Sequence, residues 1–384
     1  MLQLAPEIAT PDFVEIDGNP APPIPRVRTI TTRDGVALRA AHWPADPARP
    51  IRGSVLLFQG RAEFIEKYFE TVRDLCERGF HVATLDWRGQ GGSARRLSDA
   101  RRGHVASFKE YEADLAAFLE QMVAPNCPKP WFGLAHSMGA AILIEAVRSG
   151  AAPLERLIAL APMIGIERIG RPKLVRLAAN ALALAGLGTR YVPGGGAVSI
   201  STRPFQGNPL TSDEGRYARN AAVLGAAPRL GVGAPTIGWV RAALAQMARF
   251  AEPRYAMSIR VPILVIMPGG DRLCSLPAME RFAARLKSGS GLLLPQSRHE
   301  ILMERDAIRS LFWAAFDAFV PGASAVVSAK DAPAVRQPQV LQGVLPAGAS
   351  EATGAPPALP VDGALAVQQP QGLLVEAGVA GRDD

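Results

Sequence analysis

A serine near the middle of the chain lies where a nucleophile is needed. Ser137 separates an apolar run (131–135), which predicts a buried strand, from an Ala-, Leu- and Ile-rich run (138–148), which predicts a buried helix. The start of a helix leaves backbone N–H groups unpaired beside the serine, and these stabilise a developing oxyanion. With Ala135 and Gly139 as the small residues two positions away on either side, the pattern predicts a nucleophile elbow at Ser137.

Such a serine needs a general base, and His299 is the best placed of five histidines. It follows the last predicted strand and precedes the last predicted helix, so its loop can reach back to the elbow. Two of the others lie in strands and fit structural positions (His42, His81). His104 follows a basic loop that it can stabilise by hydrogen bonding, and His136 adjoins Ser137 but points away from it.

The histidine in turn needs a carboxylate that fixes its tautomer. Asp271 follows the apolar strand 261–267, and the order Ser137, Asp271, His299 is that of α/β-hydrolase triads. Asp271 can equally form a turn or pair with Arg272, and Glu167 is the competing acid.

Two backbone amides are predicted to hold the oxyanion. Met138 follows the nucleophile and supplies one N–H group. The loop after the early strand 54–58 should supply the other, and we expect it at Arg61, directly after Gly60.

No cofactor or metal ion is expected. Residues 89–94 match the dinucleotide pattern G-x-G-x-x-A, but no helix opens there, so the match is weak. The three cysteines lack metal-ligand spacing and read as thiols in a reducing compartment (Cys76, Cys127, Cys274).

The elements around these residues alternate between strands and helices, which predicts an α/β fold with a mostly parallel sheet. A hairpin around the Asp34-Gly35 turn (26–32 and 36–43) adds an antiparallel N-terminal edge. Helices are expected at 64–78, 108–123, 173–185, 213–223 and 236–250. Alternation stops at 163–259, which we interpret as a helical cap inserted into the core (26–162 and 260–321) over the carboxyl ends of the strands.

Both ends of the chain differ from its middle. Residues 1–25 hold six prolines, and residues 322–384 are rich in Ala, Pro and Gly without any aromatic residue. Such segments bury too little apolar surface to offset their ordering entropy, so both are predicted to be disordered.

The folded middle is basic, with 38 Lys and Arg against 25 Asp and Glu in residues 27–321. Nucleic-acid motifs are absent from the sequence, whereas an anionic substrate or membrane surface suits the charge. A basic loop is the candidate contact, although it reads equally well as solvated (Arg95, Arg96, Arg101, Arg102). Without a signal peptide or a long apolar span, we expect a cytoplasmic protein, peripheral to the inner membrane, of undetermined oligomeric state.

Several strings resemble the bacterial lysophospholipases in the monoacylglycerol lipase-like branch of the α/β-hydrolases. They are Gly-Arg-Ala-Glu (60–63), Asp-Trp-Arg-Gly-Gln-Gly (86–91), Ala-His-Ser-Met-Gly (135–139) and His-Glu-Ile-Leu (299–302). Gln59 stands where the monoacylglycerol lipases have a histidine. The resemblance implies the α/β-hydrolase fold with a lid, no cofactor, Ser137, Asp271 and His299 as triad, and Arg61 at the oxyanion site.

We therefore expect a serine hydrolase that cleaves the acyl ester of a single-chain lipid, above all a lysophospholipid. Apolar residues of the cap are expected to hold the acyl chain (Leu174, Leu177, Leu182, Leu184). The alternatives are a monoacylglycerol lipase, a general carboxylesterase, a serine aminopeptidase of the same fold, or a binding protein that keeps the fold without activity.

Overall fold

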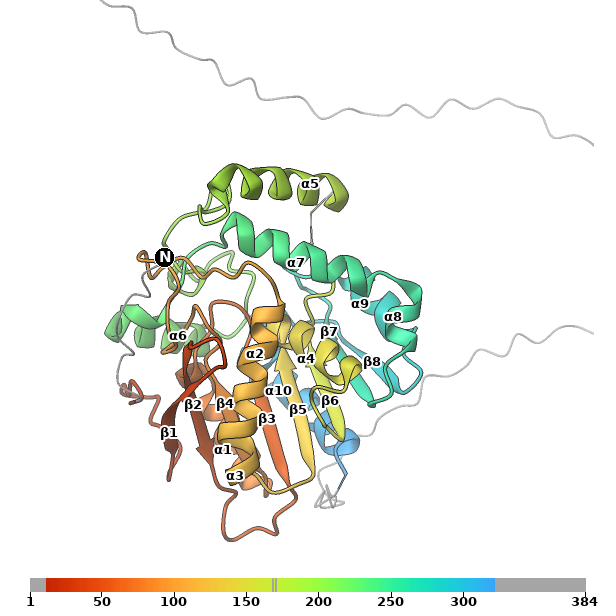
Figure 1. The fold of residues 1–384 in the computed structure, drawn as a ribbon. Coiled ribbons are helices and arrows are strands. Elements are labelled where there is room, and N and C mark those ends of the chain that lie inside the picture. Colours follow the sequence, from red (N-terminus) through yellow and green to blue (C-terminus); the bar gives the residue numbers. More distant parts are fainter. Residues whose placement is uncertain (1–11, 168, 170, 322–384) are drawn as a thin grey trace, which may run out of the picture. The chain divides into compact units, whose positions relative to one another are not determined.

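One mixed sheet forms the centre of the molecule (Figure 1). The computed structural model describes residues 12–167, 169 and 171–321. Their strands follow the order β1-β2-β4-β3-β5-β6-β7-β8; β1, β2 and β4 pair antiparallel, and all later neighbours pair parallel. This confirms the predicted sheet with its antiparallel edge. The strands are β1 (Arg26–Thr31), β2 (Ala37–Trp43), β3 (Ser54–Phe58), β4 (His81–Leu85), β5 (Trp131–His136), β6 (Arg156–Leu160), β7 (Ile263–Pro268) and β8 (Gly289–Leu294).

Helices cover both faces of this sheet, so its central strands are apolar on both sides. In β3, Val55 and Leu57 pack in a cluster with α1 and α10, whereas Leu56 and Phe58 pack in a second cluster with α2 and α4. Each such buried side chain contributes roughly 1.5–3 kcal/mol. The helices of the core are α1 (Phe69–Glu77), α2 (Lys109–Phe118), α3 (Ala124–Asn126), α4 (Ser137–Ser149), α9 (Leu276–Ala283) and α10 (Asp306–Phe319).

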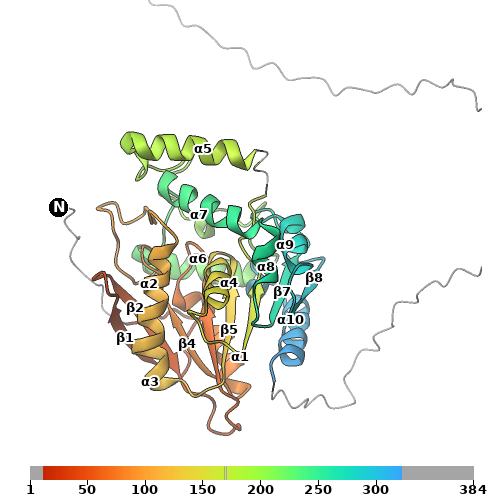
Figure 2. The same ribbon diagram turned by 45° about the vertical axis from the view of Figure 1, so that its right-hand side comes forward.

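A long insertion separates β6 from β7 and supplies a second group of helices. In both views α7 lies between the sheet and α5, and α5 lies outermost (Figures 1 and 2). We call residues 161–262 the insertion; they include the predicted cap. Its helices are α5 (Pro172–Leu182), α6 (Glu214–Ala226), α7 (Ile237–Phe250) and α8 (Pro253–Met257), with short turns η3 (Ala183–Leu187), η4 (Ile200–Thr202) and η5 (Pro228–Leu230).

Several element boundaries differ from the prediction. The helix expected at 64–78 begins with the 3₁₀ turn η1 (Ile65–Tyr68), and the helix expected at 108–123 ends in the π turn η2 (Leu119–Val123). Helices α8 and α9 are additions, because runs of five and eight residues with proline in the first turn carry little periodic signal. A further 3₁₀ turn, η6 (Ile301–Met303), precedes α10.

Part of the N-terminal extension, predicted to be disordered, packs on the core instead. Phe13 stacks on Trp43 with 5.4 Å between ring centroids, and the Trp43 indole N–H donates to the Pro22 carbonyl at 3.2 Å. One aromatic residue therefore anchors a segment that has no apolar periodicity. Residues 1–11 and the predicted tail lie outside the described residues. In the described part of the chain, none of the helices has the length and hydrophobicity that a membrane crossing requires.

Candidate active site

Ser137 lies at a strained turn between β5 and α4. Its φ of 49° is left-handed, a conformation that residues other than glycine rarely adopt. Gly139 allows the turn to approach β3, since a Cβ there would lie 2.4 Å from the Gln59 carbonyl oxygen. Ala135, one residue before the end of β5, is fully buried. Strand, strained serine and close-packed helix thus form the predicted elbow and turn the hydroxyl toward the edge of the sheet.

The structure brings Ser137, His299 and Asp271 into one hydrogen-bonded chain. His299 Nε2 lies 3.1 Å from Ser137 Oγ, and His299 Nδ1 lies 2.7 Å from Asp271 Oδ2. A proton on Nδ1, directed at the carboxylate, leaves the Nε2 lone pair for the serine hydroxyl. Among the described residues no such contact joins Glu167 to His299, so the competing acid is not at this site.

The carboxylate of Asp271 is held in its ionised form. Its second oxygen accepts hydrogen bonds from the amides of Leu273 at 2.7 Å and Cys274 at 2.9 Å. Burial alone would raise the pKa of Asp271, but the neighbouring His299 and the two amides outweigh burial, so the pKa lies below its usual range. Asp271 can therefore stabilise an imidazolium at His299.

The loop after β3 places a backbone amide opposite the start of α4. Gln90 fixes this loop, because its side chain accepts from the Ala62 amide at 3.1 Å and donates to the Gly60 carbonyl at 2.8 Å. The Arg61 amide between them has no acceptor among the described residues. Together with the Met138 amide in the first turn of α4, it is available to an oxyanion.

Gln59, which precedes Gly60 in the loop after β3, does not hold that loop through its side chain. Its side chain is fully buried, and neither its amide oxygen nor its nitrogen has a partner in the described part of the chain. The ordering of the loop comes from Gln90 and from the acidic residue Glu63.

A buried ionic network lies directly behind the serine and the histidine. Lys67 bridges Glu63 at 2.7 Å and Glu300 at 2.6 Å. His136 Nδ1 lies 3.2 Å from Glu63 Oε2, and its Nε2 lies 3.1 Å from the carbonyl oxygen of His299. We call these four charged residues the charge quartet (Glu63, Lys67, His136, Glu300); all are at least 94 % buried.

The quartet is neutral when His136 is protonated. Burial opposes every charge in it, but the ion pairs outweigh burial: the pKa values of Lys67 and His136 lie above their usual values, and that of Glu63 lies well below. The Tyr68 hydroxyl also donates to Glu63, at 2.8 Å. Two acids and two cations therefore cancel at this depth, as buried charges must.

The quartet joins the three loops that carry the site. Glu63 accepts from the Gly60 amide in the loop after β3, His136 directly precedes Ser137, and Glu300 follows His299. Sequence reasoning assigned no role to His136. The i,i+4 spacing of Glu63 and Lys67 was the visible signal for an ion pair, but the other two partners are distant in the chain.

The remaining histidines have structural partners. His42 Nε2 lies 3.1 Å from His81 Nδ1 across β2 and β4. His104 Nδ1 lies 2.9 Å from the hydroxyl of Thr236, the N-cap residue of α7. His104 therefore ties the basic loop to the insertion rather than stabilising the loop internally.

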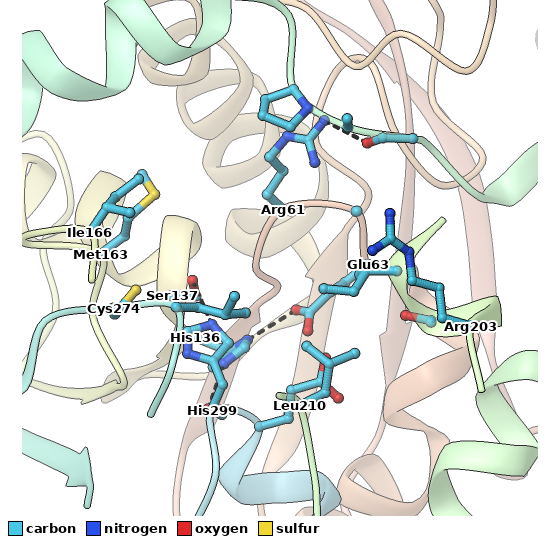
Figure 3. Close-up of a pocket in the computed structure, with 18 of the residues that line it drawn as sticks. Arg61, Glu63, His136, Ser137, Met163, Ile166, Arg203, Leu210, Cys274 and His299 are labelled. Atoms are coloured by element: carbon cyan, nitrogen blue, oxygen red, sulfur yellow. Dashed lines mark hydrogen bonds and ion pairs between the residues drawn. The ribbon is translucent and has the colours of Figure 1, made fainter. Parts of the chain in front are cut away.

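A cavity of about 330 Å³ opens above Ser137. Figure 3 shows its two sides: Met163 and Ile166 lie on one side of Ser137, and Arg203 and Leu210 lie on the other. The larger apolar side chains of the lining come from the insertion and the loop after β7 (Met163, Ile166, Val198, Ile200, Leu210, Leu273).

The prediction that α5 supplies the acyl pocket is wrong. None of the four predicted leucines, three on α5 and Leu184 on η3, lines this cavity. Leu174, Leu177 and Leu184 are 53 %, 65 % and 87 % exposed. Their helical spacing correctly marks a shared face, but that face points away from α7 and from the site.

Most arginines of the basic loop already have hydrogen-bond or ion-pair partners within the protein. Arg95 donates to four backbone carbonyls, including that of Arg229 in the insertion at 2.7 Å. Arg96 pairs with Glu110, and Arg102 pairs with Asp99. These three arginines tie the loop to its surroundings and are poor candidates for binding an external anion.

Two features of the chain resemble cofactor or metal positions. The amides of the glycine-rich loop 89–94 bond within the protein, with Gly92 donating to Asp86 at 2.6 Å and Gly91 to the Leu230 carbonyl at 3.2 Å. Among the described residues, the one cluster of metal-ligand type is Asp271, Cys274 and His299. Burial raises the pKa of the Cys274 thiol well above its usual range, which disfavours the thiolate that a metal ion needs.

Fold and site together define an α/β-hydrolase with a serine at the nucleophile elbow. Residues 49–306 match the family model described as serine aminopeptidase, S33, and the chain belongs to that family. Over 268 residues it is 35 % identical to lysophospholipase L2 of Escherichia coli K12, covering 67 % of this chain and 77 % of that protein.

Solved structures show the same fold at lower identity. A soluble variant of monoglyceride lipase from Saccharomyces cerevisiae superposes with a TM-score of 0.60 at 20 % identity, covering 78 % of this chain and 97 % of that one. A carboxyl esterase from Bacillus coagulans gives a TM-score of 0.62 at 19 % identity, covering 78 % and 98 %.

Proposed function

We propose that the protein hydrolyses the acyl ester of a single-chain lipid, a lysophospholipid above all, through an acyl-Ser137 intermediate. The observation that carries the proposal is the hydrogen-bonded chain from Ser137 through His299 to Asp271. It lies at the base of a cavity that is lined by both apolar and polar residues. The similarity to lysophospholipase L2 and to monoglyceride lipase supports a lipid ester as the substrate.

In the first half-reaction Ser137 Oγ attacks the ester carbonyl carbon while its proton passes to His299 Nε2. The amides of Arg61 and Met138 hold the oxyanion of the tetrahedral intermediate, each contributing about 10²- to 10³-fold in turnover. Collapse breaks the bond to the glycerol oxygen, which takes the proton from His299 and leaves.

In the second half-reaction water replaces the departed alcohol. His299 Nε2 removes a proton from the water as it attacks the acyl-serine carbonyl, and the same two amides hold the second oxyanion. The proton then returns to Ser137 Oγ as the fatty acid leaves. Asp271 remains ionised throughout and stabilises the imidazolium in both steps.

The monoacylglycerol lipase and carboxylesterase alternatives use the same machinery and differ only in the alcohol that leaves. A serine aminopeptidase is less well supported, because its substrate's ammonium group needs an available carboxylate. The two acids that line the cavity, Glu63 and Glu300, are both paired within the charge quartet. A binding protein without activity would not require the aligned hydrogen bonds at Ser137.

The proposal includes contact with an anionic lipid surface through α5. The outer face of this helix is apolar, and residues 172–187 hold Lys173 and Arg176 but no acidic residue. A helix of this kind lies in a membrane interface with its apolar face among the acyl chains and its cations at the lipid phosphates. The three unpaired cysteines suit a reducing cytoplasm, where the inner membrane offers that surface.

The test measures fatty-acid release from a lysophospholipid and a monoacylglycerol that carry the same acyl chain, with Ser137→Ala as blank. We expect release from both lipids, faster from the lysophospholipid, and a loss of up to about 10⁶-fold in the variant. Activity of Ser137→Ala near the wild-type level would assign the nucleophile elsewhere.

A further inference from the structure

Among the described residues, all but one of the charged side chains that line the cavity have a partner within the protein. Glu63 and Glu300 are neutralised within the charge quartet, and Arg61 donates to the Gly233 carbonyl at 2.9 Å while stacking 5.1 Å from the Trp239 ring. Among the charged side chains that line the cavity in the described part of the chain, Arg203 is the one with neither an ion pair nor a hydrogen bond. The cavity therefore presents one uncommitted positive charge.

A hydroxyl on the same turn faces the cavity with that charge. Ser201 lies in η4, two residues before Arg203, and both side chains line the cavity. Its hydroxyl has no hydrogen-bond partner among the described residues, although the residue is only 6 % exposed. A guanidinium and a hydroxyl are the donor types that bind phosphate oxygens.

A buried tyrosine holds the backbone of the turn that carries Ser201 and Arg203. The buried Tyr217 hydroxyl lies 3.1 Å from the Ile200 carbonyl oxygen and 2.9 Å from the Arg203 carbonyl oxygen, so it holds both ends of the turn. Phe205 packs against the Tyr217 ring with 5.5 Å between centroids. The backbone of the donor pair is therefore ordered before a ligand arrives, which lowers the entropic cost of binding.

The position of the pair matches the polarity of a lysophospholipid. Arg203 lies on the opposite side of Ser137 from Met163 and Ile166 (Figure 3). An ester held at Ser137 with its acyl chain along Met163 and Ile166 directs its glycerol toward Arg203. In a lysophospholipid that glycerol bears a phosphodiester, whereas in a monoacylglycerol it bears only hydroxyl groups.

We propose that Arg203 and Ser201 form a subsite for the substrate phosphodiester and so select lysophospholipids over monoacylglycerols. The inference rests on the proposed function, because it assigns a headgroup contact to an ester bound at Ser137. The guanidinium binds two phosphate oxygens through its planar fork, and the hydroxyl donates to one of them.

The experiment compares kcat/KM for the two lipids of equal acyl chain in micelles of a neutral detergent, which removes any contribution from an anionic surface. Arg203→Gln is expected to lower kcat/KM about tenfold or more for the lysophospholipid and less than twofold for the monoacylglycerol, since a charge-assisted hydrogen bond is lost in only one case. Arg203→Lys should be intermediate, because it keeps the charge and loses the fork. Ser201→Ala should cost severalfold on the lysophospholipid alone.

The matched control is Arg33→Gln, which removes the same charge from an exposed turn between β1 and β2. It should leave both rates unchanged, and thermal unfolding should show that all variants fold alike. If the wild type hydrolyses both lipids and Arg203→Gln leaves their ratio unaltered, the subsite is wrong and the proposed function stands. If the wild type hydrolyses neither, the proposed function itself is overturned.

Discussion

The charge quartet buries charged side chains, whereas the outer face of α5 exposes apolar side chains to solvent. Each arrangement is the reverse of what such side chains usually do. Four charged residues are buried behind Ser137, and each has a partner of opposite charge or a hydrogen bond. On α5, leucines are exposed to solvent and the neighbouring cations have no acidic residue on their own helix. Buried polar groups and exposed apolar groups are the informative departures from ordinary folding. The charge quartet therefore belongs to a rigid site that can do chemistry, whereas the outer face of α5 is a surface that suits an apolar medium.

The largest expected effect concerns Asp271, the acid of the proposed triad. Asp271→Asn should lower kcat about 10⁴-fold, because an amide cannot fix the His299 tautomer or stabilise the imidazolium. Glu167→Gln is the matched control, since it neutralises the competing acid, and it should leave kcat within about twofold. Steady-state kinetics on a soluble short-chain ester measures both, and a comparable loss in the control would return the acid to Glu167.

Breaking the charge quartet should affect both stability and turnover. Glu63→Gln leaves Lys67 and His136 with one acid fewer, which should cost about 3–5 kcal/mol of unfolding free energy. Denaturant unfolding measures this loss, and kcat should fall with little change in KM because the Gly60 loop and the His299 backbone are held less firmly.

The control for that variant is Glu120→Gln, which removes an exposed acid without a partner among the described residues. It should change the unfolding free energy by no more than about 0.5 kcal/mol. If the two variants have the same unfolding free energy, the quartet makes no specific contribution to stability. Its buried charges would then not distinguish the site from α5.

The quartet also predicts a pH dependence of stability. Burial lowers the pKa of His136, but the attraction of Glu63, to which Glu300 adds and which Lys67 opposes, outweighs burial and raises the pKa above its ordinary value of 6.5. A raised folded-state pKa gives stability that is complete below the unfolded value and is lost as the pH rises through the folded value. The wild type should therefore lose stability above about pH 6.5 relative to His136→Asn. Denaturant midpoints at several pH values measure the difference, and parallel curves for the two proteins would contradict it.

The smallest effect on chemistry should come from α5. Replacing Leu177 and Leu184 by Ser should weaken binding to anionic vesicles at least tenfold, because two exposed side chains lose apolar area that membrane insertion would bury. Hydrolysis of a soluble ester should stay unchanged. Leu311→Ser, at a 56 % exposed position on α10, is the control and should bind vesicles as the wild type does. Co-sedimentation with vesicles at two salt concentrations measures the change, and equal binding by all three proteins would rule out α5 as the contact.

The sequence predicted the fold and the proposed triad because their signals are local. Ser137 follows a strand and opens a helix, Asp271 and His299 each follow a strand, and parallel strands bring their carboxyl ends to one edge. The oxyanion amides were likewise predicted from short motifs around Gly60 and Ser137. Each of these features is encoded by residues within a few positions of one another.

The residues that line the cavity above Ser137 could not be predicted from local sequence patterns. The spacing of Leu174 and Leu177 shows that they share a helical face, but periodicity does not say whether that face meets the core or solvent. The packing of α7 against the opposite side of α5 decides it. The actual lining of the cavity includes Met163 and Leu210, which carry no periodic signal.

The charge quartet, the pairing of Arg95 and the uncommitted state of Arg203 were likewise decided by tertiary structure. Glu63 and Lys67 are neighbours on one turn, but Glu300 comes from the far end of the folded chain. Arg95 looks like a solvated loop residue until carbonyls on two segments surround it. A charge acts according to the partners that folding brings within a few ångströms, and a linear sequence determines the charge without determining the partners.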